Sequence, residues 1–167
     1  MSTPNSGDIA IEWPALFLDS DFVFEDNDLK QDDGLTTAVI ISLFTDKRAA
    51  ADDILPGDLD ESFPDRRGWW GDLLAPDVPG DQIGSKLWLL ERSKTVDEVI
   101  ALTELYVFDA LQWMIDDGII VDVDIEPEIE RQGSAGNDIL AIKISLKKSD
   151  GTDLALNFET IWNGVPN

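Results

Sequence analysis

The last third of the chain shows the most regular alternation of apolar and polar residues. Apolar side chains alternate with polar ones over residues 119–130, 138–148 and 153–162. A period of two predicts half-buried β-strands, because successive side chains point to opposite faces of a sheet. The stretch 149–151, Ser-Asp-Gly, predicts a tight turn, so we expect an antiparallel meander of three or four strands. The side chains expected on its buried face are Val121, Val123, Ile125, Ile129, Leu140, Ile142, Ile144, Leu146, Leu154, Leu156, Phe158 and Trp162.

Residues 95–118 carry the strongest helix signal. Thr95 and Glu98 have the spacing of a capping box, and Gly118 suits the position just after the last helical residues. The face expected to pack inward comprises Val99, Thr103, Tyr106, Val107, Ala110, Leu111 and Met114. Four further apolar residues extend around the helix: Leu102, Leu105, Phe108 and Trp113. This pattern predicts either the central core element or a helix that a partner covers.

Two further segments predict shorter helices. Residues 35–49 are rich in β-branched side chains, which favours a strand, but their apolar spacing favours a helix. The helical spacing is that of Leu35, Ala38, Val39, Ser42 and Leu43. Residues 82–94 follow Asp81, a suitable N-cap residue, and predict a short helix. Its apolar side would carry Ile83, Leu87 and Leu90.

The remaining segments are less regular. Residues 8–26 hold short apolar runs broken by Pro14 and an acidic cluster, which predicts a ragged N-terminal hairpin. Residues 50–65 contain six acids, no base and two prolines, which predicts an exposed acidic loop. For residues 1–167 as a whole we predict a single two-layer α+β domain, in which the meander packs against about three helices.

The composition narrows the classes of function. Thirty-five Asp and Glu against twelve Lys and Arg give a formal charge of −23, which repels phosphate. We therefore expect no nucleic acid and no anionic membrane surface as partner, and a basic protein or a cation instead. The absence of cysteine and histidine excludes thiolate sites, the Ser-His-Asp triad and most zinc chemistry. No signal peptide and no apolar run of about 20 residues is evident. We therefore expect the chain to be made in a cytoplasm and not to insert into a membrane.

A row of five carboxylates is the most conspicuous chemical pattern. Asp122, Asp124, Glu126, Glu128 and Glu130 share one strand face, about 6.6 Å apart. The row could hold a cation or contact a basic partner, or it could be a solvated sheet face with Lys143 and Lys147 opposite. Calcium needs ligands that converge from a loop, so the solvated face is favoured and no metal site is predicted.

A lysozyme-like hydrolase that degrades peptidoglycan with carboxylates is an alternative function class. A glycosidase needs two carboxylates about 5 to 10 Å apart, one of them with a raised pKa. With 35 acids some pair always meets that distance, so the signal is weak. We predict no catalytic residues and no cofactor. A third class is an acidic decoy that mimics DNA and binds a basic host protein. The aromatic loop and the apolar helix would have no role in such binding.

The sequence RRGWWGD, residues 66–72, concentrates aromatic surface in a segment bracketed by helix breakers. Trp69 and Trp70 could fold back onto the domain as a lid, or at least one could stay exposed beside Arg66 and Arg67. Tryptophan and arginine carry much of the binding energy in protein interfaces. The favoured interpretation is one buried tryptophan and one offered to a partner, with Arg66, Arg67, Trp69, Trp70 and Asp72 as the contact residues.

Five stretches in this order, DGLTTAVIISLFTDKRA, DRRGWWGD, IGSKLWLLERSK, ALQWMIDDGI and ERQG, resemble the Mu-like phage tail baseplate proteins. That family is similar to the lysozyme-like baseplate wedge subunit of contractile-tail phages. The resemblance runs from about Asp33 to the C-terminus. It implies an α+β structural component of a virion tail baseplate or contractile injection system, made in the bacterial host. Its partners would be other baseplate and tail proteins, it would be monomeric when free, and no catalytic residues carry over.

Overall fold

A computed structural model describes residues 8–12, 21–26, 28–32, 35–56, 65–74, 82–90, 95–131 and 138–162. The helices are α1 (Thr36–Phe44), α2 (Val96–Asp116) and two 3-10 helices, η1 (Trp70–Leu73) and η2 (Leu87–Leu90). The long strands are β7 (Ile120–Arg131), β8 (Asp138–Lys148) and β9 (Asp153–Trp162). Six strands of two residues precede α1: β1 (Asp8–Ile9), β2 (Ile11–Glu12), β3 (Asp21–Phe22), β4 (Phe24–Glu25), β5 (Asp28–Leu29) and β6 (Gln31–Asp32).

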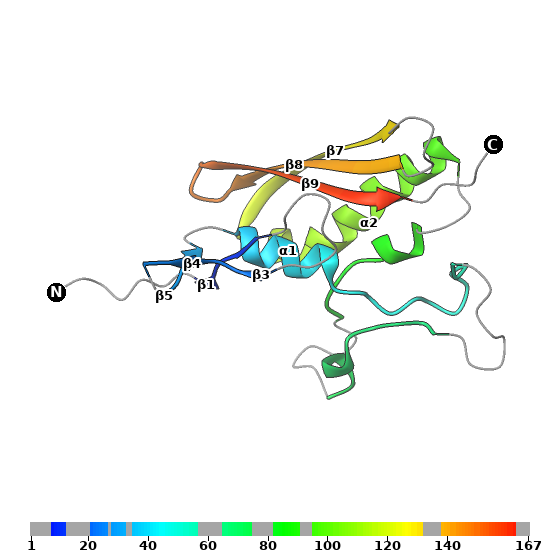
Figure 1. Cartoon of the computed structure of the whole chain (residues 1–167), viewed down its shortest axis with the longest axis horizontal. Coiled ribbons are helices and arrows are strands. Elements are labelled where there is room, and N and C mark those ends of the chain that lie inside the picture. The colour runs from blue at the N-terminus through cyan, green and yellow to red at the C-terminus, as the bar shows by residue number, and fades with distance from the viewer. Residues whose placement is uncertain are drawn as a thin grey trace.

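The predicted meander and the two-layer α+β fold are confirmed. Strands β7, β8 and β9 form one antiparallel sheet in that order. Helices α1 and α2 cover one face of it (Figure 1). The other face is exposed at most of its described positions, but Ile139 and Ala141 of β8, which alternate with the inward Leu140 and Ile142, are buried as well. The turn before β9 forms at the predicted place, where Gly151 has φ +87° and its N–H donates to the Lys148 carbonyl at 3.0 Å.

Strand β7 contains a bulge that corrects one predicted burial. Val121 was expected on the buried face, but its side chain is 58% exposed while Ile120 is 1% exposed. The register with β8 shifts between Ile120 and Asp122, so one extra residue is inserted there. A bulge inverts the alternation locally, and Ile120 therefore takes the inward position. From Val123 onward the predicted alternation of half-buried and exposed positions holds.

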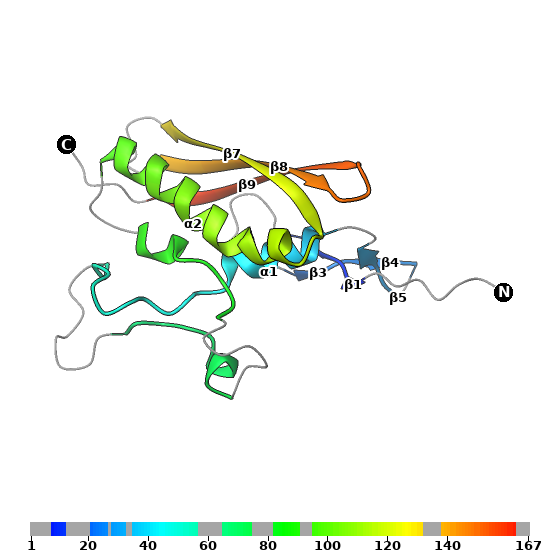
Figure 2. The same cartoon turned by 180° about the vertical axis from the view of Figure 1, so that it is seen from behind.

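Helix α2 lies along the sheet and supplies most of the helical side of the core (Figure 2). It begins as predicted, because the Thr95 hydroxyl accepts a hydrogen bond from the Glu98 N–H at 3.4 Å. Gly118 follows the C-cap with φ +69°, also as predicted. The helix buries Val99, Thr103, Val107, Ala110, Leu111 and Met114. Their apolar side chains pack with α1 and the inner side chains of the sheet in one cluster. We call α1, α2 and strands β7–β9 the body, and this cluster is its core.

Helix α1 confirms the helical prediction for residues 35–49 over a shorter span. It buries Thr37, Val39, Ile40, Ser42 and Leu43. Thr45, directly after it, is extended with φ −83° and ψ 136°, so the chain leaves the helix there. The aromatic ring of Phe44 meets Phe158 of β9 edge-on, with 5.3 Å between centroids, which fixes α1 against the sheet.

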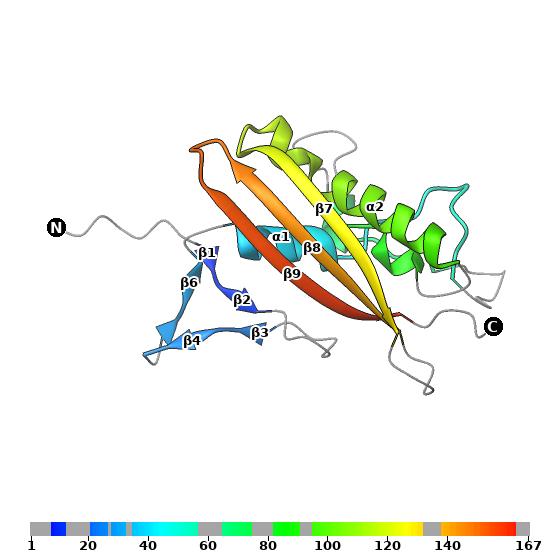
Figure 3. The same cartoon turned by 90° about the horizontal axis from the view of Figure 1, so that it is seen from above.

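The N-terminal residues form more than the predicted hairpin. Strand β2 pairs with β3 inside residues 8–26, but β1 pairs with β6 and β4 pairs with β5, so the unit reaches Asp32. We call residues 8–12, 21–26 and 28–32 the three-arm unit. Its three strand pairs surround a triangle (Figure 3). The Thr37 hydroxyl of α1 donates to the Ile9 carbonyl at 2.9 Å and accepts from the Ile11 N–H at 3.2 Å, which attaches the unit to the body.

The helix predicted for residues 82–94 is wrong over residues 82–86. There the chain is not helical, because Gly84 has φ +102° and Ser85 forms a bridge with Asp46. Only the 3-10 helix η2 follows, and Asp81 and residues 91–94 lie outside the described residues. Of the predicted acidic loop, residues 50–56 and Asp65 contain neither helix nor strand, while residues 57–64 lie outside the described residues.

Candidate functional site: the tryptophan segment and the acidic sheet face

Residues 65–74, the tryptophan segment, project from the body. Its short helix η1 is the lowest part of the ribbon in Figure 1, on the far side of the helices from the sheet. Trp69 precedes η1 in an extended conformation with φ −72° and ψ 132°. Trp70 is the first residue of η1, so the two tryptophans lie where the extended chain passes into the 3-10 helix.

The expectation of one buried tryptophan is wrong, because both are exposed. Trp69 is 44% and Trp70 69% exposed, and their ring centroids lie 5.5 Å apart at an angle of 45°. The Trp69 ring folds over Gly71, where a Cβ atom would come within 2.1 Å of it. Glycine therefore lets the Trp69 ring pack against its own turn instead of the core. Together the two rings form an exposed aromatic surface.

Arg66 is used inside the molecule. Its guanidinium group donates to the carbonyl oxygens of Ala50 and Ala51, the latter at 3.4 Å. The Arg66 carbonyl in turn accepts from the Ala49 N–H at 3.1 Å. These contacts fasten the start of the tryptophan segment to residues 49–51.

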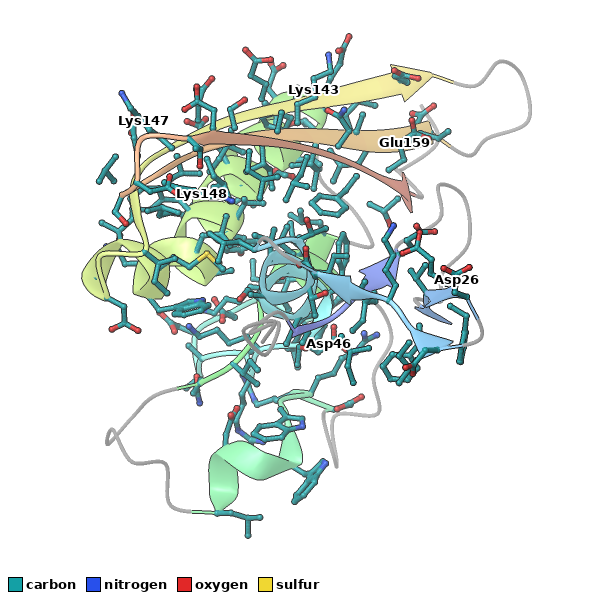
Figure 4. All side chains as sticks on the ribbon, turned by 90° about the vertical axis from the view of Figure 1, so that its left-hand side faces the viewer. Asp26, Asp46, Lys143, Lys147, Lys148 and Glu159 are labelled. Atoms are coloured by element: carbon teal, nitrogen blue, oxygen red, sulfur yellow. The ribbon has the colours of Figure 1, made fainter. Side chains whose placement is uncertain are left out.

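Arg67 continues this attachment. Its guanidinium lies 2.8 Å from the Asp46 carboxylate and 4.9 Å from the centre of the Trp88 ring. The Arg67 N–H donates to the Asp65 carboxylate at 2.8 Å, and the backbone takes φ +41°. A non-glycine residue with positive φ is uncommon, and here the surrounding contacts hold it. In Figure 4, Asp46 lies below the sheet, on the side from which the tryptophan segment projects.

Trp88 is the residue of this region that the sequence reasoning missed. It is 7% exposed, and its indole N–H donates to the Lys47 carbonyl at 2.9 Å. With Ala49 and Leu89 it forms a second, smaller buried cluster. A tryptophan between leucines in LWLL was a signal for burial, but the spacing alone did not show that Arg67 would lie on its ring.

Asp72 also turns inward. One of its carboxylate oxygens accepts a hydrogen bond from the Ile83 N–H at 3.3 Å, and the other, Oδ2, is buried and has no hydrogen-bond partner among the described residues. The tryptophan segment is thus tied at its start through Arg66 and Arg67 and near its end through Asp72. The structure brings these three charged residues together as fastenings and leaves Trp69 and Trp70 at the surface.

The five carboxylates of β7 form an exposed row, as their parity predicted. Asp122, Asp124, Glu126, Glu128 and Glu130 are all exposed. The two lysines of β8 lie opposite, since Asp122 pairs with Lys147 and Glu126 with Lys143. The Lys143 ammonium is 3.9 Å from Glu128, and Figure 4 shows both lysines on the outer side of the sheet. These lysines offset part of the repulsion within the row.

A pocket of about 280 Å³ lies between residues 47–50, residues 82–86 and helix α2. At its side, Lys86 lies 2.6 Å from Asp53. Burial alone would raise the pKa of Asp53, but hydrogen bonds from Lys86 and the Ala50 N–H, with the charges of Lys86 and Arg66, lower it from 3.8. Burial and the nearby Asp53 charge raise the pKa of Tyr106 in the pocket wall. The pocket region is thus held by an ion pair whose carboxyl stays ionised.

The chain is similar in sequence to known phage proteins over most of its length. A model of the family described as phage protein GP46 matches residues 35–153. The baseplate protein gp46 of Escherichia phage Mu is 40% identical over 138 residues, which cover 83% of this chain and 86% of that protein. The Mu-like prophage FluMu protein gp46 of Haemophilus influenzae is 33% identical over 156 residues, which cover 93% of this chain and 98% of that protein.

The fold and these likenesses define a phage protein of the Mu-like type. The chain belongs to the GP46 family of phage proteins, and the resemblance to the Mu-like baseplate family is confirmed. The match includes α1, the tryptophan segment, α2 and most of the sheet. None of the helices in the described part of the chain combines the length and the apolar character that a membrane crossing requires.

Proposed function

We propose that this chain is an assembly subunit of a contractile-tail baseplate, of the wedge type, that contacts neighbouring baseplate and tail proteins through Trp69 and Trp70. The observation that carries the proposal is the exposure of both rings on a segment fastened by Arg66, Arg67 and Asp72. A fastened segment loses little conformational entropy when it binds, so more of its contact energy appears as affinity. The name of the Mu relative, a baseplate protein, supports the same role.

The acidic row of β7 supplies a second contact surface in this proposal. Exposed carboxylates attract a basic partner over distances near the Debye length, about 8 to 10 Å at cellular ionic strength. They also keep the free subunit soluble and monomeric in the host cytoplasm. Because net negative charge repels nucleic acid, the proposed partners are proteins of the virion tail.

A role without catalysis is part of the proposal. A glycosidase acid needs a raised pKa, whereas among the described residues the two carboxyls with a clear pKa shift, Asp53 and Asp150, are shifted downward. For Asp150 the cause is hydrogen bonding from the Thr152 hydroxyl and N–H. A cell-wall zymogram of the purified protein checks this part. Clearing that disappears when one carboxylate is neutralised would make the chain a hydrolase.

The test of the assembly role replaces Trp69 and Trp70 by serine in the phage that encodes the chain. We expect the purified variant to fold, since both rings are exposed, but to yield at least about tenfold fewer complete tails. Ile54→Ser is the matched control, because Ile54 is 78% exposed outside the tryptophan segment. Its tails should assemble normally. Normal tail yield from the double variant would refute the proposed role of the two tryptophans.

A further inference from the structure

The three-arm unit is held by a closed cycle of hydrogen bonds. The Ala10 N–H donates to the Lys30 carbonyl at 2.8 Å, the Lys30 N–H to the Val23 carbonyl at 2.8 Å, and the Val23 N–H to the Ala10 carbonyl at 3.1 Å. Each of these three residues joins two of the two-residue strands. The cycle therefore sets the strand pairs as three arms around one centre (Figure 3).

The arms separate apolar from charged residues. Direct cross-strand neighbours share a face, so Phe24 lies beside Leu29 and Ile11 beside Phe22. Alternation within each arm places charged residues on the opposite face, among them Glu12, Glu25, Asp28 and Lys30. The unit thus has one apolar face, which comprises Ile9, Ile11, Phe22, Phe24 and Leu29.

Most of this apolar face remains at the surface. Phe24 is 69%, Phe22 53% and Leu29 38% exposed. The buried apolar residues of the described chain begin only at Val39, and Ile11 alone of the unit packs against that core. Strand pairs of two residues are too short to be stable without packing. An aromatic face exposed on such a weakly supported unit is typical of a surface that becomes buried in an assembly.

The charges indicate what covers it. Glu12, Glu25, Asp26 and Asp28 are exposed on the unit, against one exposed lysine, Lys30. A strand is only a few ångströms thick, so these carboxylates act on any partner of the apolar face within a Debye length. A second copy of this chain carries the same charge of −23 and is repelled. We propose that the apolar face of the three-arm unit docks on a different virion protein, whose apolar surface is bordered by lysine or arginine. This inference rests on the proposed assembly role.

The experiment introduces Phe24→Ser together with Leu29→Ser into the phage and measures how much of the protein enters purified tails. We expect at least about tenfold less incorporation. Ile54→Ser is the matched control, because Ile54 is apolar and 78% exposed but lies outside the three-arm unit and outside both proposed contact surfaces. Circular dichroism and sedimentation of the purified variant check that it folds and stays monomeric.

Hydrogen exchange keeps the inference testable if the double variant does not fold. With the unaltered protein, amide exchange at residues 21–30 should slow in assembled tails relative to the free subunit. Unchanged exchange there would overturn the inference. A second test of the charge argument uses Glu12→Gln with Glu25→Gln, which should lower incorporation several-fold. Improved incorporation would mean an acidic border on the partner and would contradict the proposal.

The outcomes separate this inference from the proposed function. Normal incorporation of the Phe24 and Leu29 variant, with failure of the Trp69 and Trp70 variant, overturns the inference alone. Normal tails from both double variants overturn both. Sedimentation that shows a wild-type dimer, abolished by Phe24→Ser with Leu29→Ser, would assign the face to a second copy and would also overturn the proposal.

Discussion

The sheet body and the loop region beneath it are held by different forces. In the body, α2 and strands β7–β9 bury a continuous apolar cluster. In the described parts of residues 46–90, Ala49, Trp88 and Leu89 form a small separate cluster, Leu87 and Leu90 join the core of the body, and polar contacts add to this attachment. Arginine side chains there bind backbone carbonyls, and the Ser85 hydroxyl binds the Leu43 carbonyl. The body is therefore tolerant of changes at its polar surface, while the loop region depends on particular polar and glycine residues.

The largest predicted effect is a cavity in the body. Leu111 is 0% exposed on α2, so Leu111→Ala should lower the free energy of unfolding by about 3 to 4 kcal/mol. Leu105→Ala on the same helix is the matched control, because Leu105 is 50% exposed. It should cost less than about 1 kcal/mol. Urea unfolding of both variants measures the difference. Equal losses would show that the outer face of α2 is packed in solution.

The next effect tests the close approach in the loop region. At Gly84, with φ +102°, a Cβ atom would lie 2.2 Å from the Thr45 carbonyl oxygen. Gly84→Ala should therefore cost about 2 kcal/mol or more, from strain and displaced backbone. Gly118→Ala is the control, since φ is +69° there but nothing lies within 4 Å. It should cost only about 1 kcal/mol from the backbone strain. Similar melting temperatures for the two variants would contradict the close contact.

A smaller effect concerns a polar contact of the body, the cap of α2. Thr95→Ala removes the hydroxyl that accepts the Glu98 N–H and should cost about 1 kcal/mol. Thr95→Ser keeps an oxygen at the same place and should cost little. Thermal unfolding followed by circular dichroism measures both. A loss as large for serine as for alanine would mean that the methyl group matters, not the hydrogen bond.

The smallest predicted effect is pH-dependent and lies in the loop region. The folded-state pKa of Asp53 is below 3.8, so its carboxylate stabilises the fold above about pH 4 and loses that contribution as the pH falls through the folded-state pKa. Asp53→Asn should therefore cost about 0.5 to 1 kcal/mol at pH 7, and the difference from wild type should shrink below pH 4. The pKa of the Asp150 carboxyl is also lowered, but Asp150 is present in both proteins, so its contribution to the pH dependence cancels in the difference. A difference that persists at pH 3 would assign the effect to packing.

The body was largely predictable from the sequence. The capping box at Thr95, the glycine after α2 and most of the alternation in β7–β9 are local signals that the structure follows. The alternation fails at the start of β8, where Ile139 and Ala141 are buried together with Leu140 and Ile142. The bulge at Val121 was not predictable, because the apolar residues Ile119, Ile120 and Val121 are adjacent and either parity satisfies the pattern. Register with β8 decided which of them turns inward.

The candidate site was predictable in composition but not in geometry. The sequence predicted that Arg66, Arg67, Trp69 and Trp70 act together in one contact segment. It did not indicate that the carbonyls of residues 50–51 and the Asp46 carboxylate would engage the guanidinium groups, since these partners are 15 to 21 residues distant. The exposure of Trp69 likewise depends on its ring folding over Gly71. Whether the two rings bind a baseplate neighbour stays a prediction.

By itself the sequence determined the α+β class, the long helix and the exposed acidic row, because each depends on the spacing of neighbours along one element. The tertiary structure alone decided the three-arm unit, the turn at Gly84 and the fastening of the tryptophan segment. Each of those depends on hydrogen bonds between backbone groups and side chains that are distant in the chain, such as Ala10 with Lys30 or Ser85 with Leu43. Backbone groups are nearly the same in every residue, so no residue pattern marks which of them will meet.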